Sequence, residues 1–268
     1  MNAFAGRVAV VTGASSGIGR ALVQRLAAKG ARVAASCIQY EQLQQTMASL
    51  PHGTEARAYM VDVSRRDAVF EHAAQVKRDF GGAHFLFNNA GMAVVGTFDH
   101  LSIEEIEFQL GVNLWGTIYG TKAFLPMMLA QREGCIVNIS SIFGLVGFPT
   151  SSAYNLSKFG VRGLTECLWS ELEGTGVRAV CVHPGGIRTN IGKSAVRCAA
   201  AGSEEQSFDR QAEKFMLTPP EECAANILRG VERGRRRIVT GHRSSTFWWL
   251  SRLLPNGYPE VVRALIPK

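Results

Sequence analysis

Two kinds of membrane signal are missing from this sequence of 268 residues. No window approaches the roughly 18–20 continuous apolar residues that a membrane-spanning helix needs. The first residues run directly into an apolar segment, without a charged leader or a small-residue cleavage site, so no secretory signal peptide is expected. The expectation is therefore a cytoplasmic protein with no transmembrane segment.

Metal-binding and disulfide patterns are absent as well. The six cysteines are scattered without C-x-x-C spacing, and the six histidines show no H-x-x-x-H pairing. Zinc sites and small disulfide-rich folds use such paired spacings. We therefore expect no metal site, and reduced, mostly buried thiols of the kind found in a reducing compartment.

What is present is typical of a globular protein with a substantial core. Hydrophobic residues make up 46% of the chain and charged residues 19%, and the net charge is +7. A basic balance suits nucleic acid or an anionic surface, but it equally suits an anionic cofactor. The basic run 235–237 is short and adjoins a predicted strand, so no nucleic-acid partner is expected.

Apolar runs of strand length alternate with helical patterns along the chain. Strands are expected at 7–11, 32–37, 56–62, 85–88, 135–140, 177–183 and 237–240, and helices at 18–29, 41–50, 66–80, 103–129 and 152–172. Strands that are apolar throughout indicate a parallel sheet buried on both faces. The prediction is an α/β fold: a single Rossmann-like, doubly wound domain over 1–268, with about seven parallel strands and helices on both faces.

Two segments depart from this alternation. The stretch of about 190–217 is a long insertion after the sixth predicted strand, as expected for a lid or binding loop. The C-terminal extension of about 243–268 is apolar, aromatic and basic. It fits either peripheral contact with a membrane surface or packing over the substrate pocket or a partner subunit, and packing is the preferred interpretation.

A glycine-rich turn, TGASSGIG at 12–19, follows the first strand and opens the first helix. Glycines let the backbone turn tightly and approach a pyrophosphate, and the helix N-terminus supplies N–H groups and partial positive charge. An ordinary glycine turn is the alternative. The strand before it and the helix after it favour a dinucleotide site.

Tyr154 and Lys158 lie four residues apart on a predicted helix, with Ser141 thirteen positions before the tyrosine. Residues at i and i+4 share a helix face. A nearby cation favours the phenolate and is expected to lower the tyrosine pKa from about 10 toward the working pH. Taken alone, this spacing also fits an ordinary amphipathic helix with an exposed lysine.

Further motifs agree with one family in order and spacing. Besides the glycine turn they are the segment NNAG at 88–91, the set Asn113, Ser141, Tyr154 and Lys158, and Pro184-Gly185 followed by Thr189. With these motifs the chain resembles a classical short-chain dehydrogenase/reductase, closely over about 6–190 and loosely beyond. The resemblance implies an NAD(P)-dependent oxidoreductase that interconverts a carbonyl group and its alcohol.

The resemblance also implies roles for individual residues. Tyr154 would be the acid/base, Lys158 its pKa setter and ribose ligand, Ser141 the holder of the substrate oxygen, and Asn113 the mark of a helix distortion in the proton relay. The implied cofactor-binding residues are Gly13, Ser15, Ser16, Gly17, Ile18, Gly19, Cys37, Asp62, Val63, Asn89, Ala90, Gly91, Tyr154, Lys158, Pro184, Gly185, Ile187 and Thr189. The implied substrate contacts are Ser141, Phe143 and Tyr154. For Asp62 a turn or helix cap remains an equal alternative.

Cys37 stands where NAD-binding folds usually carry an acid that binds the ribose 2′-OH. Without that carboxylate a 2′-phosphate is not repelled, although Ile38 replaces the arginine that usually follows. NADP(H) is therefore favoured over NAD(H).

The apolar stretch 142–148, with Val94, Val95, Ile187 and Phe215, is expected to border a hydrophobic ketone or aldehyde and its alcohol. Core packing is the alternative for each of these side chains. An isomerase or epimerase, or a non-catalytic dinucleotide-binding protein, remains open on the same fold. The resemblance further implies a homodimer or homotetramer that pairs through the helices of Asn113 and Tyr154.

Overall fold

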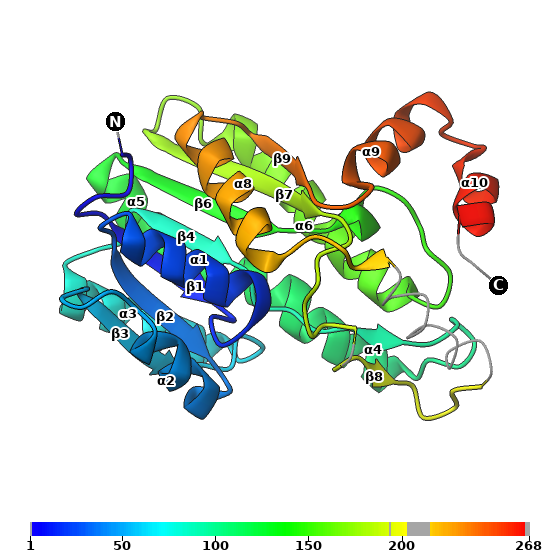
Figure 1. Cartoon of the computed structure of the whole chain (residues 1–268), viewed down its shortest axis with the longest axis horizontal. Helices are drawn as coiled ribbons and strands as arrows, with labels where there is room; N and C mark the ends of the chain where they lie inside the picture. The colour runs from blue at the N-terminus through cyan, green and yellow to red at the C-terminus, as the bar shows by residue number, and fades with distance from the viewer. Residues whose placement is uncertain (1, 193, 203–214, 266–268) are drawn as a thin grey trace.

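A computed structural model describes residues 2–192, 194–202 and 215–265. Seven strands form one parallel sheet in the order β3-β2-β1-β4-β6-β7-β9 (Figure 1). They are β1 Val8–Thr12, β2 Arg32–Cys37, β3 Ala56–Met60, β4 Phe85–Asn88, β6 Gly134–Ile139, β7 Val177–Pro184 and β9 Arg237–Thr240. The predicted seven-stranded, Rossmann-like parallel sheet is confirmed.

Helices cover both faces of this sheet (Figure 1). They are α1 Gly17–Ala28, α2 Tyr40–Ala48, α3 Arg66–Phe80, α4 Ile103–Leu110, α5 Gly116–Gln131, α6 Ser152–Glu171, α8 Pro220–Glu232, α9 Ser244–Leu253 and α10 Tyr258–Leu265. Alternate residues of a strand point to opposite faces. In β1, Val11 packs in the cluster of α1 and α8, and Val10 packs in the cluster of α3, α5 and α6.

The expected strands and helices agree with the observed ones to within about two residues at their ends, with one exception. The helix expected at 103–129 is interrupted by a π-helix at Gly111–Trp115, which separates α4 from α5. The hydrophobic pattern alone does not reveal this interruption.

One strand pair was not anticipated from the sequence. The two-residue strands β5 Val94–Val95 and β8 Val196–Arg197 pair in parallel, apart from the main sheet. The start of the predicted lid therefore lies against the loop that follows β4. The greater part of the remaining lid, including 203–214, lies outside the described residues.

The C-terminal helices pack against the turn that follows β6. Ile142 and Val146 of that turn share a buried cluster with Phe247 of α9 and Val262 of α10. This agrees with the preferred interpretation of the C-terminal extension as a packing element, at least for the inner face of α9.

Within the described part of the chain, no helix is long and apolar enough to cross a membrane. None of the six cysteines forms a disulfide within the described residues, and four of them are buried. Among the same residues no group of three or more His, Cys, Asp or Glu side chains is arranged to hold a metal ion.

Candidate active site

Parallel strands all end on one edge of the sheet, and the sequence motifs gather at that edge. Gly13 follows β1, Asn88 ends β4, Ser141 follows β6 and Pro184 ends β7. The strand order reverses direction between β1 and β4. In an open α/β sheet this switch point is where ligands bind.

The glycine turn has the backbone that a phosphate site requires. Gly13 and Gly17 have positive φ angles of 65° and 51°, and a Cβ on Gly19 would overlap the carbonyl oxygen of Gly13. Ser16 precedes α1 without a side-chain capping bond, so the first N–H groups of the helix keep their donor capacity. The turn therefore fits a pyrophosphate.

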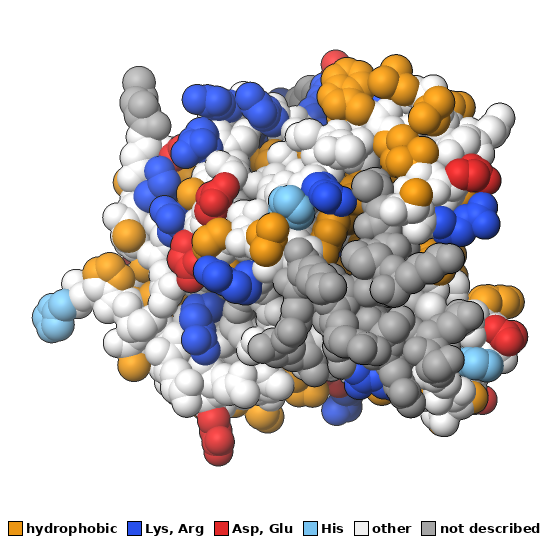
Figure 2. All heavy atoms as spheres, turned by 45° about the vertical axis from the view of Figure 1, so that its right-hand side comes forward, with side chains coloured by type: hydrophobic (Ala, Val, Ile, Leu, Met, Phe, Trp, Pro, Cys, Tyr) orange, Lys and Arg blue, Asp and Glu red, His pale blue; other side chains and the backbone are white. Residues whose placement is uncertain are grey.

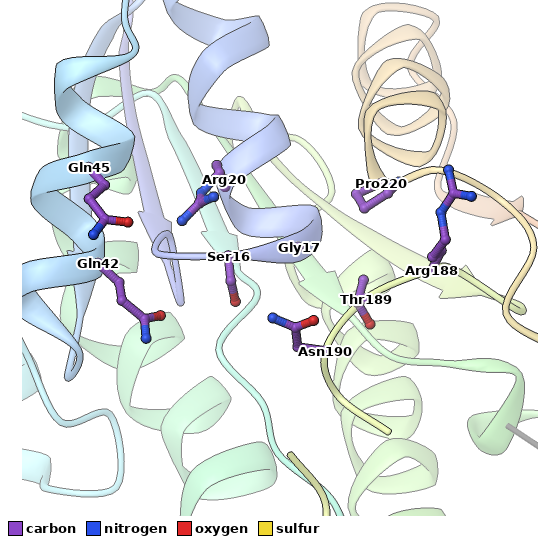
Figure 3. Close-up of a pocket in the computed structure, with 9 residues that line it drawn as sticks. All are labelled: Ser16, Gly17, Arg20, Gln42, Gln45, Arg188, Thr189, Asn190 and Pro220. Carbon is purple, nitrogen blue, oxygen red and sulfur yellow. The ribbon is translucent and has the colours of Figure 1, made fainter. Parts of the chain in front are cut away.

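A cavity of about 400 Å³ opens at the start of α1 (Figure 3). Arg20 borders it from α1 and Arg188 from the loop after β7, with Thr189 and Pro220 between them. Arg20 also donates to the Ser15 carbonyl at 2.6 Å. Arg188 was missed, although it immediately precedes Thr189 in the Pro-Gly segment. Two guanidinium groups make this cavity suitable for an anionic ligand.

Asn89 ties the end of β4 to the glycine turn. Its amide donates to the carbonyls of Thr12 at 2.9 Å and Gly13 at 3.2 Å. The Thr12 hydroxyl in turn accepts from the backbone N–H groups of Asn89 and Ala90, both at 3.0 Å. These bonds hold the carboxyl ends of β1 and β4 together.

A buried polar network under the site was not anticipated. Asn88 donates to Asn138 at 2.8 Å, and Asn138 donates to Thr165 at 3.0 Å. These bonds join β4, β6 and α6. Two asparagines at the ends of apolar strands were the available signal, because a buried amide needs partners.

Asn113 occupies the π-helix and is fully buried. Its amide accepts from the Met92 N–H at 2.9 Å and donates to the Met92 carbonyl at 3.0 Å and to Ser157 at 3.2 Å. A Cβ on Gly91 would lie 3.3 Å from the Asn113 oxygen and 3.5 Å from the Lys158 nitrogen. The structure thus places Asn113 in a helix distortion, as expected, and both Asn113 and Lys158 lie beside Gly91.

Ser141, Tyr154 and Lys158 lie together beside this distortion. The Lys158 ammonium is 5.6 Å from the centre of the Tyr154 ring and donates to the Ile139 carbonyl at 3.0 Å. The Ser141 side chain lies close enough to the Tyr154 phenol to lower its pKa against the effect of burial. The neighbouring Ser140 instead donates to the Lys158 carbonyl at 2.8 Å, which favours Ser141 as the residue that meets the substrate.

The structure corrects the expectation that Lys158 lowers the tyrosine pKa. Burial raises the pKa of Tyr154 to about 12, and the Ser141 side chain is what opposes that rise. Burial also lowers the pKa of Lys158 to about 8, with a smaller upward effect from Cys181. Desolvation disfavours both charged forms and here exceeds the attraction between them.

His183 supports Ser141 from below and was not identified from the sequence. It is fully buried on β7, and its Nδ1 lies 3.1 Å from the Ser141 carbonyl oxygen. Burial lowers the pKa of His183 to about 4, so the ring is neutral and Nδ1 carries the proton that it donates. Its place directly before Pro184-Gly185 was the available signal.

Aromatic rings extend from Tyr154 toward the C-terminal helices. The Phe143 ring meets the Tyr154 ring edge-on, with 5.2 Å between the ring centres, and stacks on the Phe148 ring, with 4.1 Å between the ring centres. Phe148 then contacts Phe247 of α9 at 5.2 Å, and Phe215 lies 6.0 Å from Phe247.

Three other apolar side chains that were expected to border the substrate lie in the protein interior instead. Val94, Val95 and Ile187 are buried in the protein, at 4% exposed or less. They fit the core-packing alternative.

The end of β2 and the end of β3 flank the glycine turn. The Cys37 thiol lies 3.0 Å from the Ser15 hydroxyl, which in turn lies 3.4 Å from the Gln39 amide oxygen. Asp62 accepts from the backbone and hydroxyl of Ser64 at 2.9 and 2.7 Å. Asp62 therefore makes the hydrogen bonds of a turn residue, which was the alternative to a cofactor contact.

A family model described as short chain dehydrogenase matches residues 7–199, and the chain belongs to this family. It is thus an NAD(P)-dependent oxidoreductase acting on CH–OH or C=O groups. Among its relatives is the putative oxidoreductase SadH of Mycobacterium tuberculosis, 41% identical over 275 residues that cover 100% of this chain and 98% of SadH.

Solved structures agree with this assignment. A short-chain dehydrogenase/reductase from Burkholderia phymatum in complex with NAD matches with a TM-score of 0.83 and 31% identity, covering 88% of this chain and 89% of that one. A metagenomic short-chain oxidoreductase in complex with NADP matches with a TM-score of 0.69 and 30% identity, covering 85% and 91%. The relatives thus include complexes with either nicotinamide cofactor.

Proposed function

We propose that this chain interconverts a hydrophobic ketone or aldehyde and its alcohol, with Tyr154 as the acid/base. The observation that carries the proposal is the grouping of the Ser141 hydroxyl, the Tyr154 phenol and the Lys158 ammonium beside an aromatic wall. In the reducing direction the phenol gives its proton to the substrate oxygen, and in the oxidising direction the phenolate accepts it. Ser141 holds that oxygen by a hydrogen bond.

Lys158 stabilises the phenolate that forms during the reaction. A phenol whose pKa is about 12 gives up its proton reluctantly, so a positive charge 5.6 Å from the ring has its main effect as negative charge develops. We assign Asn113 to the same relay, because Asn113 and Lys158 both lie beside Gly91.

The glycine turn, Asn89–Gly91 and the loop 184–189 fit a nicotinamide dinucleotide. When bound, the nicotinamide supplies or accepts the hydride, and the protein orients it. The first turn of α1 would hold the pyrophosphate, with the charge of Arg20 and Arg188 nearby. A Cβ on Gly17 would touch Thr189 at 3.0 Å, so the two loops lie close enough to bind one extended ligand.

NADP(H) is the proposed cofactor, because the side chains at the end of β2 are uncharged. Cys37, Ser15 and Gln39 contact one another there, and none of the three carries a carboxylate that would repel a 2′-phosphate.

Cys37→Asp is expected to change the NADPH/NADH ratio of kcat/KM about 10–100-fold in favour of NADH. The new carboxylate repels the phosphate and accepts a charge-assisted hydrogen bond from the ribose, which is worth about 1.5–3 kcal/mol. Steady-state rates with both cofactors measure the ratio. Cys37→Asn has the same shape without the charge and should leave the ratio near that of the wild type. An unchanged ratio in Cys37→Asp would remove Cys37 from cofactor selection.

A hydrophobic substrate is proposed from the aromatic wall of Phe143 and Phe148. Along a series of linear 2-ketones, kcat/KM should rise about fourfold for each added methylene until the wall is covered, since a buried methylene contributes about 0.8 kcal/mol. Phe148→Ala should flatten that slope. Equal kcat/KM values for short and long ketones would contradict a hydrophobic substrate.

Exposed apolar side chains on α4, the π-helix and α6 support a homo-oligomer. Four large apolar side chains on these helices are between 38% and 55% exposed: Phe108, Trp115, Leu156 and Phe159. Patches of this kind mark protein contacts. We propose a dimer or tetramer that pairs through the helices around Asn113 and Tyr154. Light scattering should give two or four times the mass of one chain, and the mass of a single chain would contradict pairing.

A further inference from the structure

The outer face of α9 carries large apolar side chains that remain in contact with solvent. Trp249 is 57% exposed, Leu253 71%, and Leu254 directly after the helix 47%. Phe247 on the inner face of the same helix is buried. Figure 2 shows apolar side chains gathered over the C-terminal helices, with basic side chains beside them. We call Trp249, Arg252, Leu253 and Leu254 the α9 surface.

Positive charge is in excess next to this surface. Two guanidinium groups lie over the Trp248 ring. The guanidinium carbon of Arg252 is 3.3 Å from the ring centre, and that of Arg237 is 4.4 Å from it. Arg237 and Arg162 share one carboxylate, that of Glu166. The pKa of Arg252 lies below its usual value because of its partial burial and the repulsion from the other two arginines. Three guanidinium groups around one carboxylate leave a net positive field, which attracts an anionic partner.

The apolar part of the α9 surface is small for a partner protein. Three side chains of this size expose on the order of 300 Å², whereas a stable protein interface buries roughly 800 Å² on each partner. A bilayer requires no complementary shape. Tryptophan prefers the headgroup region, leucine inserts below it, and arginine attracts anionic headgroups.

We infer that the α9 surface docks on the headgroup region of an anionic lipid bilayer, with α9 lying parallel to the membrane. Trp249, Leu253 and Leu254 enter the interface, and Arg252 contacts lipid phosphates or carboxylates. The opposite face of α9 holds Phe247 against Phe148. The docking surface and the aromatic wall are therefore opposite sides of one helix, and docking needs no rearrangement of the catalytic residues.

Vesicle flotation with the whole purified chain tests the inference. At low salt the chain should bind vesicles of phosphatidylcholine with phosphatidylserine at least about tenfold more tightly than phosphatidylcholine alone, and ~0.5 M salt should release it. Tryptophan emission should shift to shorter wavelength on binding. No binding to phosphatidylserine vesicles at low salt would overturn the inference.

Variants locate the surface. Trp249→Ser and Leu253→Ser should each weaken vesicle binding about fivefold or more, because each removes inserted apolar area. Phe98→Ser is the matched control: Phe98 is 73% exposed elsewhere, and its loss should change nothing. Arg252→Gln should reduce the preference for phosphatidylserine, and Arg65→Gln, at another exposed arginine, should retain it.

Two results would assign the surface to something else. If the double variant Trp249→Ser/Leu253→Ser binds vesicles as tightly as the wild type, the α9 surface is not the membrane-binding site. The same conclusion follows if Phe98→Ser weakens vesicle binding as much as the α9 variants do. If light scattering shows that the double variant loses an oligomer present in the wild type, a second copy covers the surface and the inference is wrong. Trp249→Phe, a conservative change, should keep the fold and lose part of the emission shift, so the inference stays testable even if a serine variant does not fold.

Discussion

Tyr154→Phe is expected to lower kcat by about 10²–10⁴-fold, the range that a positioned general acid contributes. The variant keeps the ring that Phe143 meets edge-on and loses only the hydroxyl whose pKa Ser141 influences. Nucleotide affinity, measured by fluorescence titration, should stay within about twofold, because no hydrogen bond to the phosphate-binding turn is removed. Steady-state consumption of NADPH with a hydrophobic ketone gives the rate.

Tyr119→Phe is the matched control, since it makes the same chemical change on α5, where the ring stacks on Trp115. It should retain the wild-type rate. Wild-type kcat in Tyr154→Phe would show that another group moves the proton. Loss of nucleotide binding together with activity would instead assign Tyr154 a structural role.

Lys158→Met is expected to lower kcat/KM for carbonyl reduction by about 10²–10³-fold. Removing one group that stabilises developing charge in an active site typically has an effect of this size. Methionine fills a similar volume but leaves the developing phenolate without a cation. Lys158→Arg should recover part of the rate because it restores the charge. Lys122→Met, at an exposed lysine on α5, should be neutral.

The pH profile separates this electrostatic role from a packing role. The pKa of Lys158 is about 8, so its ammonium is present below that pH and is lost above it. The pKa of Tyr154 is about 12, so the phenol stays protonated throughout this range. Carbonyl reduction by the wild type should therefore fall as the pH rises through about 8, and Lys158→Met should lack that fall. The same fall in the variant would contradict the assignment.

The sheet and the motif residues were predictable because local sequence determines them. Apolar strands and glycine turns have short-range patterns. The distortion at Asn113 was implied by the family resemblance, whereas the helical pattern predicted one uninterrupted helix there. The pairing of β5 with β8 was not predictable, because two-residue strands about a hundred positions apart leave no periodic pattern. The contact between His183 and the Ser141 carbonyl likewise depends on how β7 lies beside β6.

The chemistry of the site was only partly predictable for a related reason. The spacing of Tyr154 and Lys158 indicates that they share a helix face, and the structure agrees. Spacing carries no information about burial, and burial is what raises one pKa and lowers the other. In the same way, the apolar and aromatic composition of the C-terminal extension was visible in the sequence, but only the fold distinguishes buried Phe247 from exposed Trp249.

The central claim is that a hydride passes between the nicotinamide and a carbonyl carbon at the Tyr154 site. Its most direct test incubates the wild-type chain with a long-chain ketone and NADPH carrying deuterium at C4 of the nicotinamide, followed by mass spectrometry of the alcohol. The experiment is run twice, with deuterium on one C4 face of NADPH and then on the other. One of the two labelled cofactors should give an alcohol heavier by one deuterium, and one NADPH should be consumed for each alcohol formed. An isomerised product with no net consumption of NADPH, or binding without any product, would contradict the account.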